Sequence, residues 1–540
     1  MRICGIALLA AGGVLLGQSS PETKDDRKQK ARELLEKVDT SLGALGSEVN
    51  VIALAQLGGA WKSLDPGRAT AYLRQAFAAT AALPDDSSRP VRSKMQAEIV
   101  KLTVDVNLAE ACELLHGMPS GNAVDARNEA ADRVVQELIG KKEFDRAMEV
   151  LALTPADSDY PFAAAQRLFE ELPKDDSRRV LVFGNAAAAY RRRPGDAFRT
   201  FLAKHWKEVP REMAQAALGN VVNTILDRED EPGNGESLET AKGTVKLASR
   251  KSMDLFDILG LIRALDPGRY KILEDQYADL REAAQKFPDG RQSVDTSGTL
   301  RTVARKKGDE SSSGSSYNDS DDDDSAWFTA MPPMSMFDDV DAKSMQDAIR
   351  AQVAAKKKVS EAWAAFKKDH NRGISLADDI PIASMRAATL IHFADETKKD
   401  TAAARNLISK AAGIVGDIPD LRDRFWPLMT IANTEHDLHD DKASWNALEQ
   451  ARDSLQALYK SDTNADKPNK ALREFWPSTF ACRTLMYGAS KCFGTRGEEL
   501  LESLPGPDLV VMAQIELARA WVGASVFDSE HGSLSWNVVH

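Results

Sequence analysis

A stretch rich in acidic residues and histidines, "TEHDLHDDKASW", offers the side chains of this chain that best fit a metal site. Carboxylate oxygens and imidazole nitrogens are common metal ligands, and the stretch supplies Glu435, His436, Asp437, His439 and Asp440. A helix would place His436 and His439 on one face. The sequence has neither a second, distant ligand pair nor an HExxH pattern. We therefore expect no metal and no cofactor, and interpret the stretch as a loop between two helices, with Asp441 near the cap of the second.

Other catalytic patterns are weak, and we predict no catalytic residue. The chain has eight histidines, no GxSxG sequence and no cysteine with an obvious histidine and asparagine partner. Near the C-terminal end, only Glu502-Ser503 is similar to the catalytic Glu-Ser setting of lysozyme-like enzymes, although Leu501 and Pro505 fit the end of a helix. Three consecutive arginines, Arg191–Arg193, would suit an acidic partner or a solvated face.

A cluster of aromatic and methionine side chains follows an acidic tract in an otherwise polar stretch. The tract, Asp319 to Asp324, lacks the turn glycine and the distal glutamate of an EF-hand loop, so we interpret it as solvated linker. The sequence after it, "AWFTAMPPMSMF", contains Trp327, Phe328, Met331, Met334, Met336 and Phe337. Such a run suits an interaction segment that packs on this chain's own helices or on a partner, and equally a strap over the local core.

Three cysteines lie beyond the first twenty residues: Cys112, Cys482 and Cys492. An oxidising compartment would permit one disulfide, for which Cys482 and Cys492 are the best candidates. Ten residues of uninterrupted helix span about 15 Å, which is too far for a disulfide. The bond therefore requires the chain to turn near Gly488, and two buried thiols are the alternative.

The pentapeptide "LDPGR" occurs twice, at Leu64–Arg68 and Leu265–Arg269, each time between two stretches with a helical pattern. Proline disfavours the helical conformation in the residue before it, so Asp65 and Asp266 should each end one helix. Aspartate is a favoured N-cap, and proline in the first turn loses no hydrogen bond. The pentapeptide predicts a tight corner between helices, and a phosphate site at its glycine and arginine is the rival interpretation.

Three segments superpose when each is aligned on its terminal proline, at Pro84, Pro119 and Pro155, so that the period is about 35 residues. Their aligned positions have the i, i+3, i+4, i+7 spacing of a buried helical stripe. These positions are Leu73, Ala76, Phe77 and Thr80; Leu108, Ala111, Cys112 and Leu115; and Phe144, Ala147, Met148 and Leu151. The pattern recurs with Ala165 before Pro173 and with Ala411 before Pro419. We expect the shared alanine to mark the closest approach of another helix.

The period, the small residue in mid-helix and the proline at the unit boundary resemble the tetratricopeptide class of helical repeats, most clearly over Val49 to Pro155. The usual Gly and Tyr pattern of that family is not evident, and none of its ligand-binding residues can be carried over by position. The resemblance implies an all-α fold of stacked helical hairpins, an α-solenoid, in which each hairpin buries its apolar face on its neighbours.

A second echo lies in the C-terminal half, where Phe425-Trp426-Pro427 and Phe475-Trp476-Pro477 occur in similar surroundings. Both predict the start of a long helix, with proline tolerated in the first turn and the aromatic rings packed on a neighbouring unit. An exposed aromatic platform for a ligand is the alternative.

The N-terminal sequence "MRICGIALLAAGGVLLGQSS" has one positive charge at Arg2, an apolar run from Ile3 to Leu16, and small and polar residues after it. This layout predicts a secretory signal peptide with cleavage between Gly17 and Ser20, and export to the periplasm or the extracellular space. No later stretch is long and apolar enough to predict a membrane span. A formal net charge of −12 argues against broad nucleic-acid binding.

The patterns together predict a signal peptide (1–19), a helical lead-in (20–46), a helical-repeat domain (47–288), a Ser/Gly/Asp-rich linker (289–340), a second helical-repeat domain (341–527) and a tail (528–540). This organisation favours an exported, non-enzymatic scaffold that binds a protein or peptide in the cell envelope. The alternative is a peptidoglycan lyase or hydrolase on an all-α superhelical scaffold.

Overall fold

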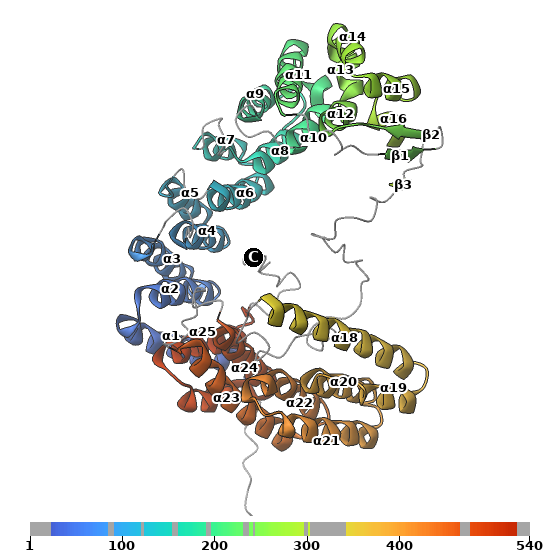
Figure 1. Ribbon diagram of the computed structural model, residues 1–540. Helices are drawn as coiled ribbons and strands as arrows, with labels where there is room; N and C mark the ends of the chain where they lie inside the picture. The colour runs from blue at the N-terminus through green and yellow to red at the C-terminus, as the bar shows by residue number, and fades with distance from the viewer. Residues whose placement is uncertain are drawn as a thin grey trace, which may run out of the picture. The chain divides into compact units, whose positions relative to one another are not determined.

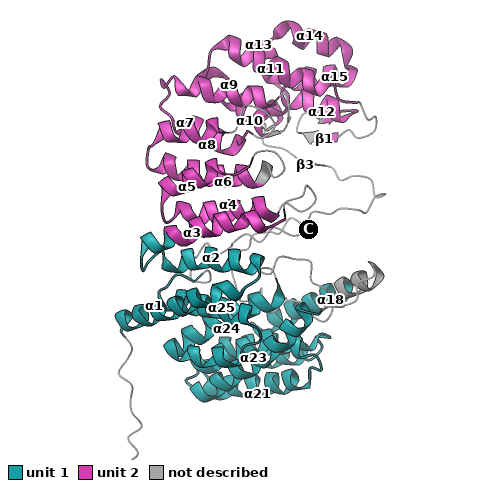
Figure 2. Cartoon of the chain, turned by 90° about the vertical axis from the view of Figure 1, so that its left-hand side faces the viewer, with its two compact units in different colours: residues 1–69, 321–540 teal, residues 70–320 magenta. Residues whose placement is uncertain are grey.

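The computed structural model describes residues 23–84, 91–119, 124–153, 160–190, 196–229, 237–240, 243–295, 301–302, 342–464 and 476–525. Most of these residues are helical (Figure 1), which confirms the expected all-α class. They fall into two compact units (Figure 2): unit 1 comprises Met1–Ala69 and Asp321–His540, and unit 2 comprises Thr70–Ser320. This grouping differs from the expected division into residues 47–288 and 341–527, because periodicity along a sequence does not tell which distant helices pack together.

Unit 2 begins with a succession of helices that pack on their near neighbours in the sequence. In chain order they are α3 (Pro66–Ala79), whose first residues up to Ala69 belong to unit 1, α4 (Val91–Val104), α5 (Leu108–His116), α6 (Val124–Gly140), α7 (Phe144–Ala152), α8 (Phe162–Glu171), α9 (Arg178–Tyr190), α10 (Asp196–His205) and α11 (Arg211–Leu226). Short 3-10 segments follow α3 (η2, Thr80–Ala82) and α10 (η3, Trp206–Glu208). Helix α4 packs on α5 and α6, α6 on α7 and α8, and α8 on α9 and α10, so each contact spans one or two helices.

The remainder of unit 2 combines short helices with a small sheet. The helices are α12 (Arg250–Asp257), α13 (Leu259–Leu265), α14 (Pro267–Gln276), α15 (Ala278–Lys286) and α16 (Arg291–Asp295). The antiparallel sheet has the order β2-β1-β3, from β1 (Ser237–Thr240), β2 (Gly243–Lys246) and β3 (Arg301–Thr302). Leu238 of β1 pairs with Val245 of β2 on one side and with Thr302 of β3 on the other.

Unit 1 contains the C-terminal helices together with the first two helices of the chain. They are α1 (Lys24–Ser41), α2 (Ser47–Trp61), α18 (Ala342–Phe366), α19 (His370–Ala377), α20 (Ala383–Glu396), α21 (Thr401–Asp417), α22 (Phe425–Asp437), α23 (Asp441–Asp462), α24 (Pro477–Phe493) and α25 (Pro507–Trp521). Three 3-10 segments, η1 (Leu42–Ala44), η5 (Leu421–Arg424) and η7 (Gly494–Ser503), link them. Antiparallel neighbours pair as α20 with α21, α22 with α23, and α24 with α25.

The first two helices complete unit 1 by packing on its last helix. Both α1 and α2 contact α25, and α2 is buried along most of its length, from Val49 to Trp61. At the edge of this contact Lys30 Nζ donates to Thr495 Oγ1 over 2.7 Å, and Lys37 Nζ lies 3.2 Å from Glu498 Oε1. The first two described helices and the last one therefore share one hydrophobic core.

The "LDPGR" corners have the predicted structure at both places. The backbone N–H of Arg68 donates to Asp65 Oδ1, and that of Arg269 donates to Asp266 Oδ1, over 3.0 Å in each case. Proline occupies the first position of α3 and of α14. The Arg68 guanidinium donates to Glu36 of α1 over 3.0 Å, and that of Arg269 donates to Asn223 of α11. The pentapeptide thus caps one helix and fastens it to an earlier one.

The shared alanine of the repeat pattern is fully buried wherever it occurs. Its relative exposure is 0% at Ala76, Ala111, Ala147, Ala165 and Ala411. A residue without a larger side chain lets two helices approach closely, as the aligned sequences predict. Among the described residues, no helix combines the length and apolarity that crossing a bilayer requires.

The predicted linker begins too early at residue 289. Helix α16 lies within it, and Val294 is completely buried. The turn before α16 depends on Gly290, whose φ is +62° and where an added Cβ would come within 2.0 Å of the Phe256 carbonyl oxygen. The glycine in "DGRQSVD" signals the turn. The burial of Val294 could not be predicted, because a single apolar residue forms no periodic pattern.

Candidate functional site

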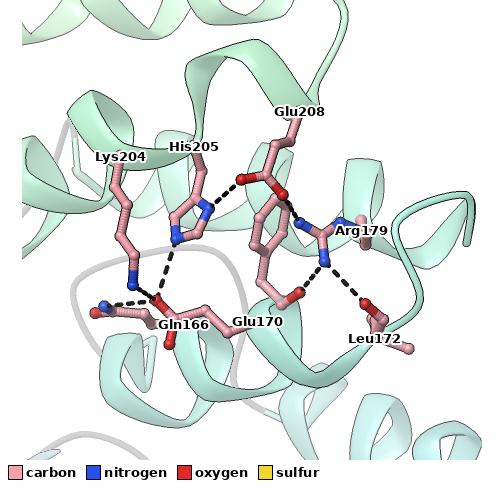
Figure 3. A network of polar contacts seen from close by, with 8 residues as sticks. Gln166, Glu170, Leu172, Arg179, Lys204, His205 and Glu208 are labelled. Carbon is pink, nitrogen blue, oxygen red and sulfur yellow. Dashed lines mark hydrogen bonds and ion pairs between the residues drawn. The ribbon is translucent and has the colours of Figure 1, made fainter.

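Charged side chains form a connected network among α8, α9, α10 and η3 in unit 2 (Figure 3). His205, at the end of α10, is 5% exposed and lies against the rings of Phe169 and Phe201, whose centroids are each 5.1 Å from its own. The amphipathic pattern of α8 and α10 puts these rings in the core. The two ring nitrogens of the buried histidine therefore need hydrogen-bond partners.

Both ring nitrogens of His205 face carboxylates. Nδ1 lies 2.9 Å from Glu208 Oε1, and Nε2 lies 3.1 Å from Glu170 Oε1. A carboxylate oxygen of an ionised side chain can only accept, so both hydrogen bonds form together when both nitrogens carry a proton. The histidine therefore bridges the end of α8 to η3.

The two carboxylates are held in their ionised form. Glu170 also accepts from Lys204 Nζ over 2.7 Å, and this bond is the main reason why the pKa of Glu170 lies below its usual value. The hydrogen bond from His205 is the largest cause of the lowered pKa of Glu208. Each pKa is lowered because the charged acceptor is stabilised more than the neutral acid.

Arg179 of α9 occupies the other end of the network. Its guanidinium donates to the carbonyl oxygens of Phe169 and Leu172 over 2.6 and 2.8 Å, and to the Glu208 carboxylate. Its Cζ also lies 3.9 Å from the centroid of the Phe169 ring. The last carbonyls of a helix lack intrahelical partners and favour a cation, so Arg179 caps the C-terminal end of α8.

The arrangement fits a structural link between helices, here called the His205 bracket, better than a reaction centre. His205 is buried and both its nitrogens are engaged, which leaves no nitrogen to take a proton from a substrate. Its two carboxylates flank opposite sides of the ring and so do not converge on one point. Among the described residues, no group of three or more histidine, cysteine, aspartate or glutamate side chains could hold a metal ion.

The network repeats a spacing that other ion pairs of unit 2 share. Glu170 and His205 are 35 residues apart, and Arg74 makes a bidentate pair with Glu110, 36 residues away. Arg178 pairs with Asp145, 33 residues away, at 2.5 Å. No sequence motif marks these residues, but opposite charges about 35 positions apart are a signal that could have identified them.

A second buried network surrounds Asp254 of α12. This carboxylate is 2% exposed and lies 3.2 Å from Arg199, 2.7 Å from Arg228 and 3.4 Å from Arg250. It joins α10 and the end of α11 to α12. The Tyr190 phenol, whose pKa is raised by burial, lies within the field of the same groups.

Unit 1 has a buried ion pair between α24 and α25. Arg483 Nε lies 3.3 Å from Glu516 Oε2, with both side chains almost fully buried. Ser525 Oγ donates to the other carboxylate oxygen of Glu516 over 2.5 Å. The hydrogen bond from Ser525 to Glu516 holds the segment after α25 against this helix.

The acidic and histidine-rich stretch is a connection between helices, as its interpretation as a loop predicted. It spans the end of α22 and the start of α23, where Asp440 is the N-cap and accepts from the backbone N–H of Ala443. His436 Nδ1 lies 3.1 Å from Asp441 Oδ1. Burial is the main cause of the raised pKa of Glu435.

Cys482 and Cys492 are free thiols, so the disulfide considered from the sequence is not formed. Both lie on α24, which continues through Gly488 without the turn that a bond would require. Cys482 is completely buried, and Cys492 is partly exposed. Cys112, the third, is buried with Arg146 Nη2 at 3.7 Å from its sulfur.

The aromatic pairs at the helix starts are packed inside. Phe425 is 0%, Trp426 8% and Trp476 9% exposed, and the ring of Trp426 lies 5.6 Å from that of Phe480. These residues are not an exposed platform. Phe475 lies outside the described residues.

The remaining candidates are either at the surface or beyond what the structure describes. Glu502 is exposed near the end of η7, and the neighbouring Ser503 accepts from Arg452. The proposed interaction segment (Trp327, Phe328, Met331, Met334, Met336 and Phe337), the acidic tract, Arg191–Arg193 and the signal peptide all lie outside the described residues.

No protein-family model matches the chain, and no curated protein matches it in sequence.

Proposed function

We propose that the protein is an exported, non-enzymatic helical-repeat scaffold that binds a protein or peptide in the cell envelope. The observation that carries the proposal is the repeat-period spacing of the ion pairs in unit 2. Arg74–Glu110, Asp145–Arg178 and Glu170–His205 each join residues about one tetratricopeptide-like period apart. Such pairs fix each helical layer to the next.

The packing of unit 2 supports the same interpretation. Helices α4, α6 and α8 contact one another in succession, and the intervening α5 and α7 pack beside them. Each layer contributes a fully buried alanine at the repeat position. A stack of this kind presents a long surface built from neighbouring layers, which suits binding an extended or helical segment of another protein.

The first described residues are compatible with removal of a leader. Thr23 Oγ1 accepts from the backbone N–H of Asp26, and the Asp26 carboxylate accepts from the N–H of Thr23, a capping box that begins α1. Cleavage between Gly17 and Ser20 would leave this cap intact. Intact-mass measurement of the protein from its native host should show loss of about the first 17 to 22 residues.

The partner can be sought by photo-cross-linking in the native envelope fraction. A photoreactive residue at Leu181 or Ile272, which are 56% and 55% exposed, leaves the core of unit 2 untouched. We expect one partner to be captured from each position and to be displaced by excess unmodified mature chain.

Capture that excess mature chain does not displace would contradict the proposal. So would turnover of purified peptidoglycan by the mature protein, if Glu502→Gln abolished it. That result would replace the scaffold with the enzyme alternative.

A further inference from the structure

Helix α18, the first described helix in the C-terminal part of unit 1, carries a concentration of positive charge. Residues 350–368, which include most of α18, contain six lysines and arginines and one glutamate. The chain as a whole has a net charge of −12. The charge of this helix is therefore opposite to that of the protein.

The positive side chains lie on the face of α18 that points away from its neighbours. Helix α18 packs on α19 and α20 (Figure 1). Ala355, Ala362 and Phe366 of α18 are buried. Exposed residues follow the opposite side at helical spacing. They are Arg350, Val353, Ala354, Lys357, Ser360, Glu361 and Ala364, with Lys356 beside them and Lys367 and Lys368 after the last turn.

Among the described residues, few of the lysines of this helix have a charged partner. Lys358 pairs with Glu361, and Lys367 lies 5.5 Å from the Trp363 ring. Lys356, Lys357 and Lys368 form no ion pair with any described residue. Asp369, the next acidic residue, accepts from the backbone N–H of Arg372 as the N-cap of α19.

Solubility alone does not require this imbalance, as α1 shows. Helix α1 also carries six lysines and arginines, but five acidic residues accompany them. Its positive side chains find partners, as in the pair of Lys37 with Glu498. Helix α18 instead places three lysines in succession, Lys356, Lys357 and Lys358, and residues 350–368 contain a single acidic side chain, Glu361.

We propose that the exposed face of α18, here called the α18 basic face, binds an acidic segment of a partner protein. The proposal rests on the scaffold function and names the chemistry of its partner. Small exposed side chains such as Ala354 and Ala364 do not project from the helix. An acidic segment can therefore lie along this face with its carboxylates beside the lysines.

A membrane surface fits the α18 basic face less well. Trp363, the aromatic residue that would anchor a helix in a bilayer interface, turns inward and stacks on Phe393 with centroids 5.5 Å apart. Phe366 stacks on the same ring. The apolar side of α18 is therefore already buried in unit 1.

The test measures binding of a fluorescein-labelled oligo-glutamate peptide to the mature full-length chain by anisotropy. The variant Lys356→Gln/Lys357→Gln/Lys368→Gln should weaken binding about tenfold at low salt, as expected for three exposed charges together. The control Lys94→Gln/Lys271→Gln/Lys442→Gln removes the same charge from exposed lysines elsewhere and should stay within about twofold of the parent. All six positions are exposed, so both variants should keep the helical circular dichroism of the parent.

Equal weakening by both variants, or no peptide binding by the parent, would overturn the proposal. So would a loss of binding to phosphatidylserine vesicles in the first variant with peptide binding unchanged, because the face would then serve a membrane. The scaffold function is tested separately: if the envelope partner cross-links equally to the parent and to the first variant, the α18 proposal fails and the scaffold proposal stands.

Discussion

Glu170 Oε1 lies 3.1 Å from Nε2 of His205, although the two residues are 35 positions apart in the chain. The bond connects the last turn of α8 to the last turn of α10. Because Nδ1 of the same ring faces Glu208, a single buried histidine fixes three elements of unit 2.

Replacing His205 with alanine should destabilise α8 and α10 by about 2 to 4 kcal/mol, because it removes buried ring volume and leaves carboxylates without their donor. Hydrogen exchange of the amides of these helices is the suitable measurement, since a chain with two units need not unfold in one transition. Lys204→Gln, at a side chain that is 60% exposed, is the matched control and should cost less than about 1 kcal/mol. Equal protection in the parent and His205→Ala would show that the bracket carries no stability.

Acid should weaken the same region of unit 2. Glu170 and Glu208 have lowered pKa values, through the bonds from Lys204 and His205 respectively. Their stabilising contribution is thus complete above the unfolded pKa of about 4.3 and is lost as the pH falls through the lower folded values. We expect amide protection of α8 and α10 to decrease below about pH 4.5. The double variant Glu170→Gln/Glu208→Gln should flatten this dependence, and an unchanged slope would contradict the assignment.

The N-cap at Asp266 should stabilise α14 as much as an ordinary helix cap does. Asp266→Ala removes the acceptor of the Arg269 N–H and should destabilise α14 by about 1 kcal/mol, whereas Asp266→Asn should have a much smaller effect. Asp275→Ala tests an exposed carboxylate within the same helix. Hydrogen exchange at the start of α14 separates the two variants. A loss with Asn as large as with Ala would point to charge instead of capping.

The mature chain should contain three free thiols of different reactivity. Burial raises the pKa of Cys492 to about 11, so its partly exposed thiol should react slowly with a maleimide at neutral pH. Cys112 and Cys482, both buried, should react only after denaturation. Mass spectrometry of the labelled chain counts the thiols. A single label in denaturing, non-reducing conditions would show that Cys482 and Cys492 are bonded after all.

The sequence predicted the features that depend on a few neighbouring residues. The caps at Asp65 and Asp266 follow from the chemistry of Asp-Pro, and the buried positions of Ala76 and Ala111 follow from helical spacing. Local patterns decide these features because the partners are a turn or less away.

Features that depend on distant partners could not be predicted in the same way. Nothing in α1 specifies α25 as its neighbour, because an amphipathic face packs on any apolar surface that fits it. The hydrogen bonds of His205 could not be predicted either, since only the folded structure brings Glu170 and Glu208 to opposite sides of its ring. The β1–β2 hairpin was missed because each of its strands has only four residues.

The contact of α1 and α2 with α25 also sets an order of events during synthesis. Helix α1 ends at Ser41 and α25 begins at Pro507, so at about 5 to 20 residues per second the ribosome needs on the order of half a minute to a minute and a half between them. During that time α25 has not been made, so α1 and α2 lack the surface on which they pack in the folded protein. The apolar side of α2 is then left to chaperones or to the translocation machinery. Helices α1 and α2 therefore reach their native packing partner only when translation is almost complete.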